Sequence, residues 1–235
     1  MNILITGITS GIGLALVKEF FDCGHTIIGC SRDVTKLNHL DCLQQSNNHF
    51  ISQVDVSNDS MVKQWSENVY MKYDKIDLII NNAGTKSKLL PTWQISTEDF
   101  EQAIKTNVFG IASVIRYFVP EMVKNNSGII INMTSEWGKY ADAYVSSYCA
   151  SKFAVEALTQ SLAKELPQNM ASIALNPFFV KTQLLEACKE LFLPGEYELS
   201  ITPDEWAKFS VPKILALDNT YNGKSVTFHP LAPSI

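Results

Sequence analysis

Residues 2–21 read NILITGITSGIGLALVKEFF, and this stretch decides the fold. It begins with a short apolar run typical of a buried strand, and residues 14–21 have the apolar spacing of an amphipathic helix. Between them lie Gly7, Gly11 and Gly13, which let the backbone turn tightly and approach a pyrophosphate at the positive end of the helix. Strand, glycine-rich turn and helix together predict a dinucleotide-binding unit, and a tight turn without a ligand is the alternative.

A second feature is the pair Tyr148 and Lys152, which opens an apolar helical stretch with the spacing Tyr-x-x-x-Lys. This spacing places both side chains on one face of a helix, one turn apart. A lysine ammonium beside a phenol favours the phenolate, so we expect the pKa of Tyr148 to fall toward neutrality. A tyrosine tuned in this way can give or take a proton at a carbonyl or alcohol oxygen. Two unconnected surface residues on a helix are the alternative.

Apolar strand-like and helix-like segments alternate along the chain, which predicts parallel β–α–β units in one doubly wound α/β domain covering residues 1–235. No internal repeat or domain linker interrupts them. Strands are expected at residues 2–5, 25–30, 50–54, 76–80, 128–134, 171–175 and 224–228. Helices are expected at residues 14–21, 34–46, 59–73, 97–124, 145–166, 183–192 and 203–217.

Polar or glycine residues follow most of these strands where the strands end. They are Gly7, Arg32, Asp55, Asn81, Ser135 and Asn176. Because ligands of doubly wound sheets bind beyond the carboxyl ends of the strands, this clustering predicts one site at that edge. Local roles stay open for some of them. Asp55 could cap the turn before the next helix, and Asn81 and Asn82 could bond only nearby backbone groups.

Five motifs, in order, resemble the short-chain dehydrogenase/reductase family in its common single-domain form. They are T-G-x-x-x-G-I-G at 6–13, N-N-A-G at 81–84, Asn107, Ser135 and Y-C-A-S-K at 148–152. The resemblance covers nearly the whole chain. It implies a Rossmann-type parallel sheet with helices on both faces, and an NAD(P)-dependent oxidoreductase that interconverts a carbonyl and an alcohol.

The resemblance also implies a role for each catalytic residue. Ser135 would bond the substrate carbonyl, and Tyr148 would donate the proton to it. Lys152 would lower the tyrosine pKa and bind the nicotinamide ribose. Asn107 would hold a water in the proton relay, unless it is only a polar helix residue bonded to nearby backbone. The implied cofactor-binding residues, besides Tyr148 and Lys152, are Gly7, Thr9, Ser10, Gly11, Ile12, Gly13, Ser31, Arg32, Asp55, Val56, Asn82, Ala83, Gly84, Pro177, Val180 and Thr182.

The end of the second strand bears on which nicotinamide cofactor binds. A carboxylate there would accept bonds from a ribose diol and repel a 2′-phosphate. This chain instead has Ser31 followed by Arg32, whose guanidinium suits a phosphate, and Thr9 adds a hydroxyl. In the family this pattern implies NADP(H) in preference to NAD(H). The alternative is that Arg32 only pairs with Asp33 or stacks on adenine.

One position departs from the family pattern. Phe178 follows Asn176-Pro177 where the family usually has glycine. A phenylalanine there needs an ordinary φ, or it costs of order 1 kcal/mol or more of strain. The substitution leaves the family resemblance intact, and it puts the path of the local loop and the shape of the pocket in question.

The residues expected to face the substrate are mainly aromatic and aliphatic. They are Glu136, Trp137, Ala143, Tyr144, Phe178, Phe179 and Leu184, with residues 182–200 covering them. No lysine or arginine is among them, so a small anionic keto acid would have no partner for its charge. Apolar walls with a few polar groups favour a medium-sized hydrophobic or cyclic carbonyl compound. Glu136 either bonds a substrate hydroxyl or amine or turns to solvent.

Composition excludes several other classes. The chain is 46% hydrophobic and 18% charged with a net charge of −5, which suits a globular protein and argues against nucleic-acid or anionic-membrane binding. The N-terminus resembles no signal peptide, and no apolar run approaches the roughly 18 residues of a membrane span. The scattered cysteines indicate reduced, mostly buried thiols and a cytoplasmic location. The histidines show no ligand spacing, so no metal is expected.

Other functions on the same fold stay open. An imine reductase or a biosynthetic reductase of carrier-bound substrates is one, and Lys86, Lys88 and Lys139 are candidates for a basic patch that would bind a carrier. A nucleotide-sensing protein with little catalysis is another. The resemblance further implies a homodimer or homotetramer in which the helices at 97–124 and 145–166 pair across a two-fold axis; within one subunit these faces could instead only cover the sheet.

Overall fold

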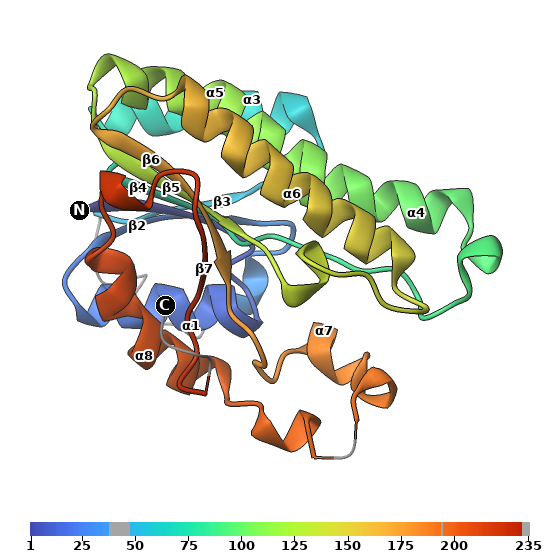
Figure 1. Ribbon diagram of the computed structural model, residues 1–235. Coiled ribbons are helices and arrows are strands. Elements are labelled where there is room, and N and C mark those ends of the chain that lie inside the picture. The colour runs from blue at the N-terminus through green and yellow to red at the C-terminus, as the bar shows by residue number, and fades with distance from the viewer. Residues whose placement is uncertain (38–47, 194, 232–235) are drawn as a thin grey trace.

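A seven-stranded parallel sheet forms the centre of the protein in the computed structural model, which describes residues 1–37, 48–193 and 195–231 (Figure 1). The strand order is β3-β2-β1-β4-β5-β6-β7. The direction of winding therefore reverses between β1 and β4. The strands are β1 Asn2–Thr6, β2 Thr26–Ser31, β3 Phe50–Gln53, β4 Leu78–Asn81, β5 Gly128–Met133, β6 Met170–Asn176 and β7 Ser225–Thr227.

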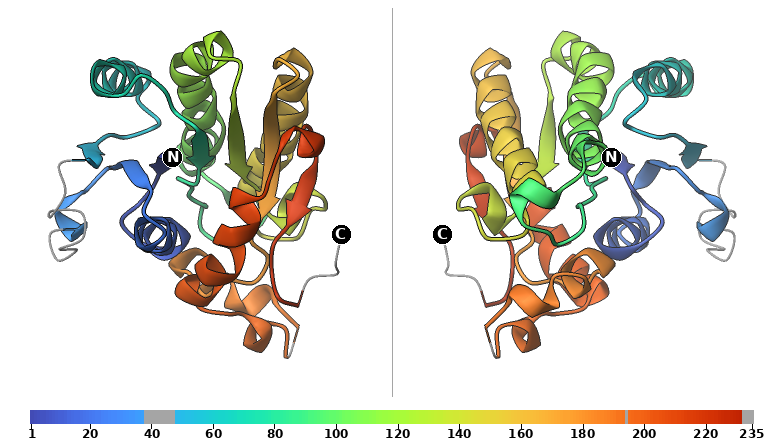
Figure 2. Two further views of the ribbon diagram at one scale, coloured as in Figure 1. Left: turned by 90° about the vertical axis from the view of Figure 1, so that its left-hand side faces the viewer. Right: turned by 90° about the vertical axis from the view of Figure 1, so that its right-hand side faces the viewer.

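Helices cover both faces of the sheet, and the two side views show the three layers (Figure 2). On one face lie α3 Asp59–Lys72, α4 Thr97–Ile104, α5 Gly110–Lys124 and α6 Ser146–Glu165. On the other face α1 Gly11–Asp22 packs against α8 Pro203–Leu215. The segment with α7 Gln183–Glu186 and the short turns Lys189–Leu191 and Tyr197–Leu199 lies beside the second layer, at one end of the sheet.

The sheet is apolar on both faces because the helices bury both. Ile3 and Ile5 of β1 belong to the core between the sheet and α1 and α8, whereas Leu4 belongs to the core on the opposite face. All three are fully buried. The nearly continuous apolar runs seen in the sequence are what a parallel sheet covered on both sides requires.

The predicted fold class is confirmed, and the element boundaries differ at several places. The helix expected at 97–124 is interrupted by a π-helical turn at Lys105–Phe109, which separates α4 from α5. The helix expected at 183–192 is two short pieces, and β5 ends at Met133, before Ser135. Of the helix expected at 34–46, only a short turn at Thr35–Leu37 lies within the described residues.

Three of the cysteines are buried as expected, namely Cys30, Cys149 and Cys188, and Cys23 is exposed, while Cys42 falls outside the described residues. In the part of the chain that the structure describes, no helix is both long and apolar enough to cross a bilayer.

Candidate active site

Hydrogen bonds tie the glycine-rich turn to the end of β4. The hydroxyl of Thr6 accepts from the backbone N–H groups of Asn82 (3.0 Å) and Ala83 (2.9 Å). The Asn82 amide donates to the carbonyl oxygens of Thr6 (2.9 Å) and Gly7 (3.1 Å). Asn82 therefore bonds backbone groups of the glycine-rich turn, which is far from it in the sequence, and in doing so it shapes the turn.

Glycine is required at two positions of this turn by close approach. A Cβ at Gly13 would lie 2.1 Å from the Gly7 oxygen, and a Cβ at Gly7 would lie 2.8 Å from Cα of Ala83. Gly7 also has φ +73°. Ser10, the N-cap of α1, makes no side-chain capping bond, so its hydroxyl is available at the helix N-terminus. This end of the helix is a cradle suited to an anionic group.

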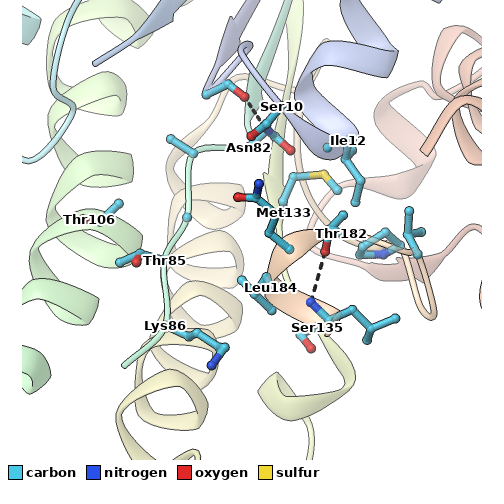
Figure 3. Close-up of a pocket in the computed structure, with 18 of the residues that line it drawn as sticks. Ser10, Ile12, Asn82, Thr85, Lys86, Thr106, Met133, Ser135, Thr182 and Leu184 are labelled. Atoms are coloured by element: carbon cyan, nitrogen blue, oxygen red, sulfur yellow. Dashed lines mark hydrogen bonds between the residues drawn. The ribbon is translucent and has the colours of Figure 1, made fainter. Parts of the chain in front are cut away.

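One cavity of about 640 Å³ runs along the carboxyl ends of the strands and brings most of the predicted residues together (Figure 3). The predicted cofactor residues that line it are Gly7, Thr9, Ser10, Gly11, Ile12, Ser31, Arg32, Asp55, Val56, Asn82, Ala83, Gly84, Pro177, Val180 and Thr182. Ser135, Tyr148, Lys152, Trp137, Phe178 and Leu184 line it as well. Gly13 is not in the lining, because it packs beneath the turn.

At the β2 end of the cavity, Arg32 is exposed and keeps its guanidinium away from Asp33. The Asp33 carboxylate instead accepts from the backbone N–H (3.1 Å) and hydroxyl (2.5 Å) of Thr35. Among the described residues Arg32 and Asp33 form no ion pair. The hydroxyls of Thr9 and Ser31 lie 2.9 Å apart. A guanidinium and two hydroxyls thus face the same end of the cavity.

Asp55 caps a local turn, as the alternative considered for it proposed. Its carboxylate accepts from the backbone N–H (2.9 Å) and the hydroxyl (2.7 Å) of Ser57, which caps the turn before α3. The residue also lines the cavity next to Val56.

At the other end of the cavity, Tyr148 and Lys152 are buried, with 6% and 5% of their surfaces exposed, so they are not unconnected surface residues. Lys152 Nζ donates to the carbonyl oxygen of Met133, the last residue of β5 (2.7 Å), and lies 5.5 Å from the centre of the Tyr148 ring. The ring of Trp137 meets Tyr148 edge-on at 6.0 Å. The pair therefore sits at a dry end of the cavity.

Burial is the main cause of the pKa shifts of Tyr148 and Lys152, and the lysine charge is not. Desolvation raises the pKa of the Tyr148 phenol, and a hydrogen bond with Ser135 opposes that rise. Desolvation likewise lowers the pKa of Lys152 to about 8, against the charge of Glu156. The expectation that the tyrosine pKa falls toward neutrality is therefore wrong for this structure, because removing both groups from water disfavours the charged form of each.

Asn107 lies in the π-helical turn and is fully buried. Its side chain accepts from the backbone N–H of Thr85 (2.8 Å) and donates to the Thr85 carbonyl (2.8 Å) and to Ser151 (2.8 Å). The Ser151 hydroxyl donates to the Tyr148 carbonyl (2.7 Å). The side-chain amide of Asn107 thus connects the loop after β4 to α6, and the residue itself is not in the cavity lining.

Four predicted substrate residues do not line the cavity: Glu136, Ala143, Tyr144 and Phe179. Glu136 neither faces a substrate nor turns freely to solvent, because it accepts a short hydrogen bond from Asn176 and pairs with Lys139 (3.6 Å). Tyr144 is 49% exposed, with φ +66°. The stretch before α6 leaves Ala143 and Tyr144 exposed, a direction that spacing from Tyr148 does not reveal.

Phe178 adopts φ +60°, in the left-handed region that favours glycine. Of the two possibilities expected from the sequence, an ordinary φ or a strained backbone, the structure has the strained backbone. The Phe178 ring packs against Phe179 (4.3 Å) and the buried His229 (5.2 Å), and its backbone N–H donates to Asn176 (2.9 Å). These contacts offset the backbone strain.

Sequence reasoning missed several lining residues. They are Cys30, Val54, Thr85, Thr106, Met133, Thr134, Lys181, Gln183 and Pro203. Most adjoin a recognised motif and lacked a signal of their own. Lys86, one of the three candidates for a basic patch, does line the cavity, whereas Lys88 is exposed and does not.

The fold and site together define a doubly wound dinucleotide-binding oxidoreductase of the Tyr-x-x-x-Lys type. A family model described as short chain dehydrogenase matches residues 1–190, and this chain belongs to the short-chain dehydrogenase/reductase family.

Curated relatives and solved structures agree. The chain is 42% identical over 96% of its length, and 92% of the relative's, to an NADPH-dependent pterin aldehyde reductase of Arabidopsis thaliana. It is 36% identical to a 3-oxoacyl-[acyl-carrier-protein] reductase of Thermotoga maritima, over 80% of this chain and 77% of that one. A closed form of serine dehydrogenase complexed with NADP⁺ superposes with a TM-score of 0.85 at 26% identity, covering 100% of this chain and 97% of the other.

The first prediction concerns Lys152. The lysine pKa is about 8 in the folded chain and 10.5 ordinarily, so between these values the unfolded chain binds more protons and stability rises with pH. Lys152→Met lacks this titration. As the pH rises from about 8 to about 10.5, the free energy of unfolding of the wild type should therefore increase relative to that of the variant by on the order of 3 kcal/mol. Urea titrations at several pH values in this range measure the difference. The exposed Lys88→Met is the control. A gap between wild type and Lys152→Met that is independent of pH would contradict the buried titration.

The second prediction concerns Phe178. Because its φ is positive, Phe178→Gly should be more stable than Phe178→Ala by about 1 kcal/mol in chemical unfolding. The matched pair is Phe179→Gly and Phe179→Ala, where the usual order, alanine above glycine, is expected. The same order at both positions would show that the left-handed conformation carries no cost.

Proposed function

We propose that this enzyme is an NADP(H)-dependent carbonyl reductase with Tyr148 as its proton donor, and that its substrate is a flat heteroaromatic aldehyde of the pterin type. The observation that carries the proposal is one continuous cavity with a cationic, hydroxyl-lined end at Arg32 and a buried Tyr148–Ser135 pair at the other. The first end suits a 2′-phosphate, and the second suits a carbonyl oxygen.

The residues present fit a dinucleotide. The glycine turn leaves room that a Cβ would fill, the N-terminus of α1 offers backbone N–H groups, and Arg32 has a guanidinium that Asp33 does not engage. Pro177, Val180 and Thr182 would contact the nicotinamide end. Relatives whose names specify NADPH or NADP support the choice of NADP(H) over NAD(H).

A bound nicotinamide nucleotide would supply hydride to the carbonyl carbon, and the chain would supply the proton and the orientation. Ser135 holds the carbonyl oxygen by a hydrogen bond. Tyr148 donates its phenolic proton to that oxygen as charge develops there, and its raised pKa keeps the proton in place until then. The ammonium of Lys152 faces the Tyr148 ring and stabilises the tyrosinate left behind.

The substrate class follows from the walls and from the relatives. Trp137 and Tyr148 line the cavity and present aromatic surface to it, while Phe192 of the segment at 182–200, which does not line it, stacks on Trp137 with ring centres 6.1 Å apart and 19° between planes. Such walls suit a flat ring. The relative named as a pterin aldehyde reductase supports the same class. We propose that residues 182–200 cover this substrate.

A carrier-bound substrate is a weaker proposal, although a relative is named for one. Lys139 pairs with Glu136, and neither it nor Lys88 lines the cavity, so Lys86 is the one member of the expected basic patch that does. The substrate proposal is tested by measuring the rate of NADPH oxidation with a panel of substrates, namely pterin aldehyde, benzaldehydes, cyclic ketones and acyl thioesters. Efficient turnover of the thioesters alone would reverse this ranking.

The third prediction concerns the proton donor. Tyr148→Phe removes only the phenol, so turnover of the best aldehyde should fall by on the order of 10²–10⁴-fold while the Kd for NADPH stays the same. Ser135→Ala should lose about 10²-fold. Tyr144→Phe, at an exposed tyrosine outside the cavity, is the control and should behave as wild type. Nearly normal turnover by Tyr148→Phe would remove this residue from the mechanism.

The fourth prediction concerns the nucleotide. Arg32→Asp removes a charge-assisted bond and adds repulsion, so the Kd for NADPH should rise by roughly 10²-fold while that for NADH changes little. Lys36→Asp makes the same change of charge at a nearby exposed lysine and is the control. Equal weakening of both nucleotides, or by both variants, would mean that Arg32 does not recognise the 2′-phosphate.

The fifth prediction concerns assembly. Ile111, Val114 and Val155 are buried within the subunit, but Phe109 and Phe153 remain 57% and 44% exposed. We propose that the helical segments at 97–124 and 145–166, which carry these residues, pair across a two-fold axis in a dimer or tetramer. Light scattering should show a multiple of the 26.2 kDa subunit, and Phe109→Glu with Phe153→Glu should release the subunit. Met71→Glu on α3 is the control; a wild-type protein of subunit mass at micromolar concentration would exclude the interface.

A further inference from the structure

Lys86 sits on a short segment that is held firmly on both sides. Its neighbour Thr85 is bonded through both backbone groups to the buried side chain of Asn107. Its other neighbour Ser87 is buried, and the hydroxyls of Ser87 and Ser147 lie 2.6 Å apart. The backbone at Lys86 is thereby anchored to the π-helical turn on one side and to the first turn of α6 on the other, and its side chain lies along the cavity (Figure 3).

This lysine belongs to the catalytic end of the cavity. A Cβ at Gly84, two residues before it, would lie 4.0 Å from Lys152 Nζ and 3.5 Å from the Asn107 amide oxygen. Ser147, which holds Ser87, directly precedes Tyr148. Arg32 and the hydroxyls of Thr9 and Ser31 lie on β2 and the glycine turn, on the opposite side of the switch point.

The Lys86 ammonium has little to compensate its charge. It is half-buried, and the hydrogen bond that it makes is a long one of 3.3 Å to the carbonyl of Ser87. No carboxylate of the described chain lies within ion-pair distance of it. Its charge is felt at the buried Cys188, where it lowers the pKa of the thiol against the larger effect of burial. A half-buried cation without a partner favours an anion in the space beside it.

An apolar cluster lies near this cation. Cys188, Trp137 and Tyr148 belong to one apolar cluster, against which Leu184 and Phe192 pack. A substrate in this part of the cavity would therefore meet aromatic and aliphatic surface together with the ammonium of Lys86.

We infer that Lys86 determines substrate specificity by binding an anionic or electron-rich oxygen of the substrate, on the side of the ring away from the reacting aldehyde. The inference rests on the proposed function and narrows its substrate class to flat aromatic aldehydes that carry a carboxylate or ring carbonyl oxygen. Lys86 takes no part in the transfer of hydride or proton.

The experiment compares benzaldehyde with 3- and 4-carboxybenzaldehyde in wild type, Lys86→Met and Lys88→Met, using NADPH. Wild type should favour the better carboxylate by about 10-fold or more in kcat/KM, as expected for a charge-assisted bond. Lys86→Met should lose that preference, keep its turnover of benzaldehyde and keep its Kd for NADPH. Lys88→Met, with an exposed lysine two positions away, should match wild type.

A binding measurement separates this inference from the proposed function. The Kd values of hydroxymethylbenzoates and of benzyl alcohol are measured for the enzyme saturated with NADP⁺, which requires no turnover. If no aldehyde is reduced but Lys86→Met selectively weakens the benzoates, the reductase proposal fails and the role of Lys86 stands. If Lys86→Met leaves the preference for carboxylates intact in both assays, or weakens NADPH as much as the carboxylates, the role of Lys86 is overturned.

Discussion

The hydrogen bonds between Asn82 and the Thr6–Gly7 turn fix the glycine-rich turn against the end of β4, where the strand order reverses. A crevice opens at this point because the connections from β1 and β4 leave toward opposite faces of the sheet. The Asn82 amide fixes the carbonyl of Gly7, and Gly13 packs onto the same oxygen. The position of α1, and with it the anion-binding end of the cavity, depends on this contact.

A second set of buried polar contacts connects β4 and β5 to α6. Asn81 donates to Asn132 (2.8 Å), Asn132 donates to Thr159 (2.9 Å), and Thr159 donates to the carbonyl of Val155 (2.7 Å). Because buried polar groups without partners are costly, this chain of bonds specifies one register between β4, β5 and α6. Tyr148 and Lys152 lie on the same helix, so their placement against β5 inherits that register.

The site therefore combines a rigid frame with two titratable groups, Tyr148 and Lys152, whose charged forms burial disfavours. Lys152 is held by a single carbonyl and has its pKa lowered, and Tyr148 keeps its proton. A proton donor must hold its proton until charge develops on the substrate, and a dry site strengthens every interaction with that charge when it appears. Lys86 is half-buried near the same apolar cluster, and in our proposal partial removal from water likewise strengthens its interaction with a charged group of the substrate.

The sequence by itself determined the fold class, the family and the set of segments that meet at the site, because apolar periodicity, glycine spacing and the Tyr-x-x-x-Lys pair are local signals that survive without coordinates. Only the tertiary structure decided where individual side chains point and how they titrate. Glu136 is adjacent to Ser135 yet bonds Asn176 and Lys139, and Lys86 faces the cavity while Lys88 does not. Asn107 in the π-helical turn bonds Thr85 and Ser151, and burial sets the direction of the Tyr148 pKa, so both depend on contacts between segments far apart in the chain. Burial and hydrogen bonding are properties of the packed molecule, and no spacing along one segment encodes them.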